Sequence, residues 1–469
     1  MRLYLINPYN SLAGMTKLKE NYWNRYRVWK PLGLLVVAGL TPPEWNITVI
    51  DENIGAPDYD KMPRPDLVGI TAFTAQAVRA YEIAAKFRGR GVPVVLGGIH
   101  ATMRSAEALR YVDAVVTGEA ENIWPQVLED VRQRSLRRMY TGTLGEMETV
   151  PMARHDLLPN KYQFGSIQTT RGCPLSCSFC SVTAFNGRRY RHRPIEDVIR
   201  EFKLIREKYV LIVDDNIIGT RKDHIRRTKE LFRAIIQADI RKKWIGQATI
   251  NMADDEDLLR LAVKSGCLGV FIGFESPNIE GLVEVHKQFN VQKDRDLRAS
   301  VKKIQRHGLL VLGSFIIGLD VDEKGIGLQT AAAAKQYGLD AINVLCLTPL
   351  PGTELWEKME SEGRILANIF PEDWKYYTFG FPVASYRNLS SADVVEEMEA
   401  CRVSFYSYPR ILGRVFSNLR TMRKPYRSLV TNLSQGRNSS RADREAYLEM
   451  DLARNRAQTE LEPVPESKA

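Results

Sequence analysis

The run Phe164-Gly-Ser-Ile-Gln-Thr-Thr-Arg-Gly-Cys173-Pro-Leu-Ser-Cys177-Ser-Phe-Cys180 decides the fold of this chain. A strand pattern leads directly into a loop that Gly172 and Pro174 mark, and three cysteines lie in this loop. They are separated by three and then by two residues, so their thiolates can point at one small object. A structural zinc site takes four ligands, usually as two pairs, and no second pair of Cys or His lies at a matching distance. Three thiolates with one open position suit an iron–sulfur cube, and a reduced loop without metal is the alternative.

This loop resembles the signature of the radical S-adenosylmethionine (SAM) enzymes. The resemblance implies that Cys173, Cys177 and Cys180 ligate a 4Fe-4S cluster whose open iron chelates the amino and carboxylate groups of SAM. An electron passed from the cluster to SAM then releases methionine and a 5′-deoxyadenosyl radical, while the protein positions the reactants and excludes water. Phe179 is expected to pack near the adenine, and simple packing of the loop is the alternative.

The composition is that of an ordinary globular protein. The chain has 469 residues, enough for two or three domains, and 44% of them are hydrophobic and 26% charged. Cys267, Cys346 and Cys401 stand alone in apolar or helical patterns, which predicts buried thiols in a reducing compartment. The first residues are typical of a strand rather than a signal peptide, and the longest apolar run, Leu32–Leu40, is too short to span a bilayer. We therefore expect a cytoplasmic protein.

Residues 1–140 alternate strand and helix patterns, which predicts an α/β domain with a doubly wound, Rossmann-like parallel sheet. The expected strands are Arg2–Asn7, Asn46–Asp51, Leu67–Thr71, Val92–Gly97 and Ala114–Gly118, and the expected helices are Pro31–Leu40 and Ala75–Arg88. Ligands of such sheets bind at the carboxyl ends of the strands, where small residues let a large, flat ligand approach the backbone. The residues expected to contact a ligand there are Thr71, Thr74, Gly97, Gly98, Gly118 and Glu119.

This domain resembles the cobalamin-binding domain that precedes many radical SAM domains. The matching features are Pro31-Leu-Gly-Leu34, Gly69-Ile-Thr-Ala-Phe-Thr74, Leu96-Gly-Gly-Ile-His100 and Gly118-Glu-Ala-Glu121. The loop after the first strand lacks Asp-x-His-x-x-Gly and so offers no histidine as lower cobalt ligand, although this subgroup can hold cobalamin without it. His100 is a substitute ligand, but we favour a loop histidine that caps the next helix. A doubly wound fold without a cofactor is the alternative for the whole domain.

A linker at 141–163 is expected to lead into a second domain at 164–355. Its six strands, each followed by a helix, resemble the partial (βα)6 barrel of the radical SAM family, in which chemistry belongs at the carboxyl ends of the strands. After the strand at Phe164, we expect strands at Leu211–Asp214, Trp244–Ile250, Leu268–Gly273, Leu309–Ile317 and Ala341–Leu347. The expected helices are Ile195–Tyr209, Lys222–Ala238, Glu256–Lys264, Asp294–His307 and Gly325–Tyr337.

The barrel resemblance implies further contacts to SAM by strand position. Asp215 follows the second strand, where the family meets the amino group of methionine; the usual Gly-Gly-Glu is absent, and a helix N-cap competes. Glu275 is expected to bind ribose hydroxyls or the amino group, because an uncompensated carboxylate after an apolar strand has few structural reasons to exist. Gln247 is expected to reach the ribose, and Gly313 and Gly318 to let the adenine approach the backbone.

Residues 356–469 are expected to be mainly helical, with a disordered end. The aromatic-rich stretch 370–386 lines a pocket or forms core. The formal net charge of +10 is concentrated here, since residues 402–444 contain ten Lys or Arg and one acid. Arginines interleaved with apolar residues indicate an amphipathic helix packed on the barrel. Docking to an anionic membrane surface and RNA binding are the alternatives, in that order.

Together the resemblances imply a cobalamin-dependent radical SAM enzyme that methylates an unactivated carbon of a small-molecule or lipid-like substrate. One SAM would methylate cobalt, and a second would supply the radical that removes hydrogen from the substrate. Relatives with the same plan perform ring closure or rearrangement, and this alternative stays open. A tRNA methylthiotransferase has a second cysteine trio, whereas residues 1–172 contain no cysteine. A non-enzymatic iron–sulfur protein would leave the SAM-like strand ends at Glu275 and Gly313–Gly318 without a purpose. We expect an electron donor such as flavodoxin or ferredoxin, peripheral membrane contact at most, and no nucleic-acid partner.

Overall fold

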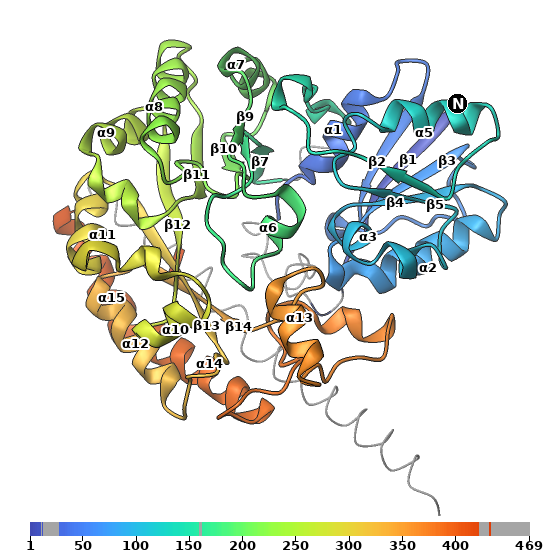
Figure 1. Cartoon of the computed structure of the whole chain (residues 1–469). Helices are drawn as coiled ribbons and strands as arrows, with labels where there is room; N and C mark the ends of the chain where they lie inside the picture. Colours follow the sequence, from blue (N-terminus) through green and yellow to red (C-terminus); the bar gives the residue numbers. More distant parts are fainter. Residues whose placement is uncertain (11, 13–27, 159–161, 422–430, 433–469) are drawn as a thin grey trace, which may run out of the picture.

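The computed structural model describes residues 1–10, 12, 28–158, 162–421 and 431–432, and it contains two parallel sheets with helices on their faces (Figure 1). The chain end at 433–469, which we expect to be disordered, lies outside the described residues. The α/β class and the order of the two sheets along the chain agree with the sequence-based expectation.

The first sheet is parallel throughout and has the strand order β2-β1-β3-β4-β5-β6. Its strands are β1 (Arg2–Asn7), β2 (Asn46–Asp51), β3 (Leu67–Thr71), β4 (Val94–Gly97), β5 (Ala114–Thr117) and β6 (Met139–Thr141). Helices α1 (Leu32–Leu40) and α5 (Trp124–Arg132) contribute to the core on one face, and α2 (Ala77–Arg88) and α3 (Ile99–Met103) to the core on the other. The doubly wound prediction is therefore confirmed.

Strand β6 is a difference from the expected architecture, because it adds a sixth strand next to the expected linker. It is three residues long, and only Tyr140 in its middle is buried. A single buried side chain gives no period-two pattern, so the sequence carried no strand signal there.

The second sheet follows the chain order from edge to edge, β7-β10-β11-β12-β13-β14, and all its strands are parallel. Its strands are β7 (Phe164–Ile167), β10 (Tyr209–Ile212), β11 (Lys243–Gln247), β12 (Cys267–Glu275), β13 (Leu310–Ile317) and β14 (Ala341–Cys346). The connecting helices include α7 (Ile195–Leu204), α8 (Lys222–Gln237), α9 (Glu256–Lys264), α11 (Leu297–Arg306) and α12 (Ile326–Tyr337). This is the expected open (βα)6 arrangement, and Figure 1 shows the helices along the outer side of the curved sheet.

Side-chain caps fix where several of these helices begin. Asp255 accepts a hydrogen bond from the Leu258 amide and starts α9 at the expected residue. Asp296 caps α11 in the same way, through the Ala299 amide. The sequence pattern placed the start of α11 at Asp294, but that residue ends a short 3-10 turn (Gln292–Asp294) instead.

The C-terminal region packs on both sheets. Helix α14 (Ser391–Phe405) lies along α12, where the Glu397 carboxylate accepts hydrogen bonds from the amides of Gly325 (2.6 Å) and Gly327 (2.7 Å). The stretch 365–383, just after α13 (Glu354–Ser361), packs on the α2 and α3 face of the first sheet. Trp374 is fully buried there and donates from Nε1 to Glu107 Oε1 at 2.9 Å. Trp374, Tyr377, Phe381 and Val383 of the aromatic stretch are therefore core, which is one of its two expected roles.

Helix α15 (Tyr408–Thr421) follows α14. Its Ile411 is buried, and its Arg414 guanidinium lies over the Phe405 ring at 4.0 Å and donates to the Phe405 carbonyl at 2.9 Å. Tyr408 and Leu412 are exposed. The start of the basic tail thus packs one side of a helix on α14, in agreement with the favoured interpretation.

The three cysteines outside the loop are buried, and no described helix could span a membrane. Cys267, Cys346 and Cys401 are all buried and unpaired, as expected. Among the described residues, every helix is too short or too polar to cross a bilayer.

Replacing Trp374 by Ala is expected to lower the free energy of unfolding by about 3–5 kcal/mol. The change empties a fully buried site and leaves Glu107 without its indole donor. Urea unfolding followed by circular dichroism measures the effect. Trp29→Ala is the matched control, because the Trp29 side chain is 42% exposed and its loss should cost much less. Equal losses in the two variants would contradict the packing described here.

Candidate active site

The cysteines lie on a loop whose two ends pair with each other. Strands β8 (Thr170–Arg171) and β9 (Arg191–His192) pair in antiparallel fashion at its two ends, and α6 (Ser181–Asn186) lies within it. Gly172 has φ of +83°, and a Cβ there would overlap the Arg189 carbonyl oxygen, so only glycine fits. Neither β8 nor β9 was expected, because a two-residue strand has no periodicity.

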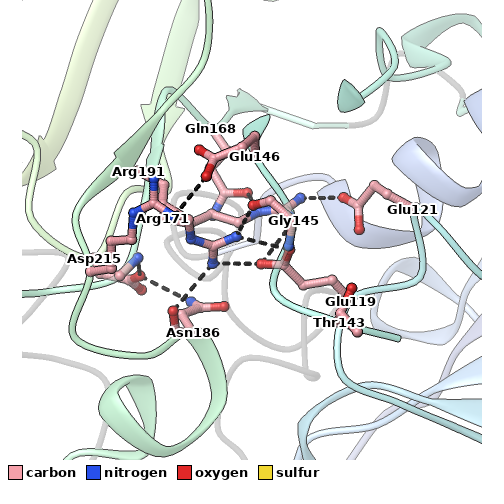
Figure 2. Close-up of polar contacts among 12 residues, drawn as sticks. Glu119, Glu121, Thr143, Gly145, Glu146, Gln168, Arg171, Asn186, Arg191 and Asp215 are labelled. Atoms are coloured by element: carbon pink, nitrogen blue, oxygen red, sulfur yellow. Dashed lines mark hydrogen bonds and ion pairs between the residues drawn. The ribbon is translucent and has the colours of Figure 1, made fainter. Parts of the chain in front are cut away.

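Asp215 holds this loop from the second strand of the barrel. Its Oδ2 accepts a hydrogen bond from Asn186 Nδ2 at 2.9 Å (Figure 2). It accepts a second from the Gly172 amide, also at 2.9 Å. The carboxylate thus joins the start of the loop to the end of α6. The sequence predicts that Asp215 meets the amino group of SAM; the structure adds a role in holding the loop, which the sequence does not reveal.

The three loop cysteines are partly exposed and close enough to influence one another. Burial raises the pKa of the Cys180 thiol to about 12, and Cys177 and Cys173 add to this rise. Burial is also the main cause of the raised pKa values of Cys173 and Cys177. In the part of the chain that the structure describes, no group of three or more Cys, His, Asp or Glu could hold a single metal ion. A four-iron cluster is larger than one ion, and a donor set made of three thiols suits it.

A buried ion pair lies behind the cysteine loop. Glu275 ends β12 with φ of +61° at a register shift, and its Oε1 accepts a hydrogen bond from Lys287 Nζ at 3.0 Å. The residues before Lys287 contact the loop, since the Val285 carbonyl accepts from the Ser178 amide at 3.4 Å. The Glu275 carboxylate is therefore compensated, and our premise that it lacks a structural partner is wrong. Lys287 was missed because it lies in an irregular segment without a motif.

The other residues expected to contact SAM differ in how well their positions agree with such a contact. Gln247 ends β11 and is exposed at the carboxyl edge, and Phe179 packs against the barrel core. Gly313 lies in the middle of β13, where a Cβ would overlap Cδ1 of Leu339 from the connection between α12 and β14, so room for this side chain is one reason for the glycine. Gly318 follows β13 with φ of +108°, and a Cβ there would lie 2.8 Å from the Tyr386 ring. Both glycines make room for protein side chains.

A cavity of about 340 Å³ lies between the first sheet and the cysteine loop. This volume falls in the range of about 300–1,000 Å³ that ligand sites occupy. From the first domain, the strand ends and α1 line it; from the second, it is lined by Gln168, Arg171, Phe185, Asn186 and Val213. The expected ligand contacts that line it are Thr71, Gly97, Gly98, Gly118 and Glu119.

Two expected or considered ligand residues lie outside this cavity. Thr74 is buried at the start of a 3-10 turn (Thr74–Gln76) and is not among the lining residues. His100 is fully buried in α3, with Nε2 2.9 Å from the Tyr81 hydroxyl and its ring against Trp374. It is neither a cavity ligand nor the cap of α3, whose N-cap is Gly98.

An ion-pair network joins the cavity wall to the cysteine loop (Figure 2). Glu119 accepts from both terminal nitrogens of Arg191 at 2.6 and 2.9 Å and lies 3.3 Å from Arg171 Nη1. Arg171 also binds Glu121 Oε1 at 2.5 Å and donates from Nε to Gln168 Oε1 at 2.7 Å. We call Glu119, Glu121, Arg171 and Arg191 the bridging network.

The bridging network favours the charged forms of Glu119 and Arg171, although both side chains are buried. Burial raises the pKa of Glu119, but the hydrogen bonds from Arg191 and the positive charges of both arginines outweigh it, so this pKa is lowered. Burial lowers the pKa of Arg171, and Glu121 and Glu119 reverse the shift and raise it. Glu119 was expected to contact a ligand; the arginine partners were not foreseen, because they come from the second domain.

Two protein families match this chain. The model of the radical SAM superfamily matches residues 167–325, and that of the B12 binding domain matches residues 24–128. Among curated proteins, an uncharacterized methyltransferase, PH0819, of Pyrococcus horikoshii is 29% identical and covers 81% of this chain and 89% of its own length. Bacteriochlorophyllide d C-12(1)-methyltransferase of Chlorobaculum tepidum is 29% identical, with 75% and 77% covered.

Further relatives extend the range of named reactions. The hopanoid C-2 methylase of Rhodopseudomonas palustris is 28% identical over 72% of this chain and 65% of its own length. An anaerobic magnesium-protoporphyrin IX monomethyl ester cyclase of Rubrivivax gelatinosus is 23% identical over 77% of this chain and 69% of its own length.

The fold has a solved counterpart in OxsB, a cobalamin-dependent SAM radical enzyme whose structure contains aqua-cobalamin. The TM-score is 0.65 at 13% identity, and the match covers 96% of this chain and 75% of OxsB. The two matching domains, in this order and around one cavity, identify the chain. It belongs to the radical SAM enzymes that carry an N-terminal B12-binding domain.

Proposed function

We propose that this protein is a cobalamin-dependent radical SAM methyltransferase that acts on an unactivated carbon of a small-molecule or lipid-like substrate. The observation that carries the proposal is the position of the cavity. One wall of the cavity is formed by the carboxyl ends of the strands of the B12 domain, and the other includes residues of the cysteine loop. The strand ends that would hold cobalamin and the residues Phe185 and Asn186 of the loop that would hold the cluster thus face one cavity, and a substrate there would lie next to both.

The residues of the cavity suit a corrinoid. Gly33 in α1 lines it, and a Cβ there would meet nothing within 4 Å. Gly98 has φ of +91°, and a Cβ there would lie 2.6 Å from Thr71 Oγ1, so the backbone stays bare at the strand end. The described lining residues include no histidine, which suits a cobalamin whose lower face takes no protein ligand.

The protein's own part in the reaction is to hold and separate reactive groups. Cys173, Cys177 and Cys180 would hold the cluster, and Glu275, kept in place by Lys287, is our candidate for the amino group of SAM. When bound, the cluster and SAM supply a 5′-deoxyadenosyl radical, and cobalamin supplies the methyl group. The apolar side chains of α1 that line the cavity would exclude water.

The nature of the relatives supports methylation over ring closure. The bacteriochlorophyllide and hopanoid relatives are methyltransferases by name, at 28–29% identity, whereas the cyclase relative is 23% identical. Pigments and hopanoids are large and hydrophobic, which favours a lipid-like substrate here. Ring closure without methyl transfer is the second candidate.

The partners and location are also part of the proposal. We propose a cytoplasmic protein that takes electrons from a flavodoxin- or ferredoxin-type donor. The exposed side chains of Tyr408 and Leu412, beside the arginines of α15, support peripheral contact with an anionic membrane.

Protein prepared without oxygen and supplied with cobalamin is expected to contain about four irons and one cobalt per chain. Its visible spectrum should be of the base-off type and show no histidine ligated to cobalt; the absence of histidine from the described cavity lining predicts the second feature. Metal analysis and absorbance measure both. The variant with Cys173, Cys177 and Cys180 all changed to Ala should lose the iron and keep the cobalt. Iron without cobalt would favour the second candidate, and no iron would overturn the proposal.

Replacing Gly33 by Leu is expected to weaken cobalamin binding at least tenfold, because the new side chain enters open space in the cavity. Helix α1 should tolerate it, since leucine favours a helix over glycine by up to about 1 kcal/mol. Equilibrium dialysis gives the affinity, and thermal unfolding tests the fold. Gly413→Leu is the control, because Gly413 is also a helical glycine, in α15, where a Cβ meets nothing within 4 Å, and this residue does not line the cavity. Normal binding by the Gly33 variant would place cobalamin elsewhere.

A further inference from the structure

The bridging network holds both ends of the cysteine loop at one point. Arg171 immediately precedes Gly172 and Cys173, and Arg191 follows the loop on β9. In the β8–β9 pair these two arginines are direct cross-strand partners. Like charges directly opposite each other destabilise a pair of strands, so the pairing depends on a counter-charge. Glu119 supplies it, because its carboxylate contacts both arginines.

The counter-charge comes from the other domain. Glu119 and Glu121 follow Gly118, which has φ of +71°, at the end of β5, and both line the cavity. The side chains of Arg191 and Glu119 are 2% and 6% exposed, so solvent screens their attraction little. The wall of the cavity and the closure of the loop thus share one set of contacts.

The network continues to the third cysteine. Arg191 donates to the carbonyl of Asn186 at 3.2 Å, and Asn186 ends α6, whose N-cap is Cys180. Asn186 also lines the cavity. A ligand in the cavity therefore touches the residue that ends the helix following Cys180.

A role in stability alone explains this arrangement poorly. A buried ion pair is often no more stabilising than well-packed apolar residues, but it fixes one geometry when both partners are present. Here the fixed geometry is that of the loop relative to the cavity.

We propose that the bridging network couples the two cofactor sites, so that cobalamin binds more tightly when the cluster is in place. This inference rests on the proposed function. Because coupling between two sites is reciprocal, cobalamin also stabilises the cluster-bound loop. Glu119 acts as a positioning residue, since it acts through the arginines at the ends of the loop.

The test compares cobalamin affinity in two states of the full chain. Hydroxocobalamin is titrated without oxygen into cluster-loaded protein and into the same protein after removal of iron with a chelator. The wild type is expected to bind at least about fivefold more tightly when loaded, as sites coupled through one network do. In Glu119→Gln this ratio should fall to about one, because the amide no longer neutralises the arginine pair.

Glu52→Gln is the matched control. Like Glu119, Glu52 is a buried glutamate of the B12 domain whose carboxylate is bound by an arginine. Arg79 donates to it from Nη2 at 2.8 Å and from Nε at 3.0 Å, and Glu52 does not line the cavity. Its loss should reduce stability and leave the affinity ratio at the wild-type value. Glu121→Gln removes only a contact of Arg171 and should give an intermediate ratio, which keeps the test valid if the Glu119 variant does not fold.

The outcomes separate the two proposals. A wild type that binds no cobalamin in either state overturns the proposed function and this inference with it. A wild type that binds cobalamin with the same affinity in both states overturns this inference alone. So does a Glu119 variant that keeps the wild-type ratio, even if its stability is lower.

Discussion

The centre of this molecule depends on one electrostatic constraint. Two arginines face each other where the cysteine loop closes, and a carboxylate from another domain lies between them. Without that carboxylate the short β8–β9 pair would hold two like charges together in a region closed to solvent. The parallel sheets of the two domains therefore cannot be arranged independently of the loop, and their carboxyl ends meet around a shared cavity.

The main elements could be predicted from the sequence because their patterns are local. Strands such as Arg2–Asn7 and helices such as Glu256–Lys264 have the expected bounds, since alternation, apolar faces and capping residues lie within each segment. Strands β6, β8 and β9 are two or three residues long and arise from pairing with distant residues. No local pattern could have revealed them.

In the candidate site, too, the features set by local pattern and topology could be predicted, and the contacts between distant segments could not. The glycines at strand ends, such as Gly97 and Gly98, line the cavity as expected, because the edge of a doubly wound sheet is set by its topology. The side chains beside Gly313 and Glu275 could not be predicted, because these neighbours, Leu339 and Lys287, come from segments that the motifs do not include. The side chain of Thr74 does not line the cavity, since a 3-10 turn begins at this residue.

The burial of Trp374 against the first sheet has a consequence for synthesis of the chain. The face formed by α2 and α3 is completed by residues made more than two hundred positions after β6. At about 5–20 residues per second, a ribosome needs roughly 10–50 s to make that stretch. During this interval the B12 domain has its strands but presents an uncovered apolar face. A nascent chain of this length is therefore a natural client for chaperones that bind exposed apolar surface.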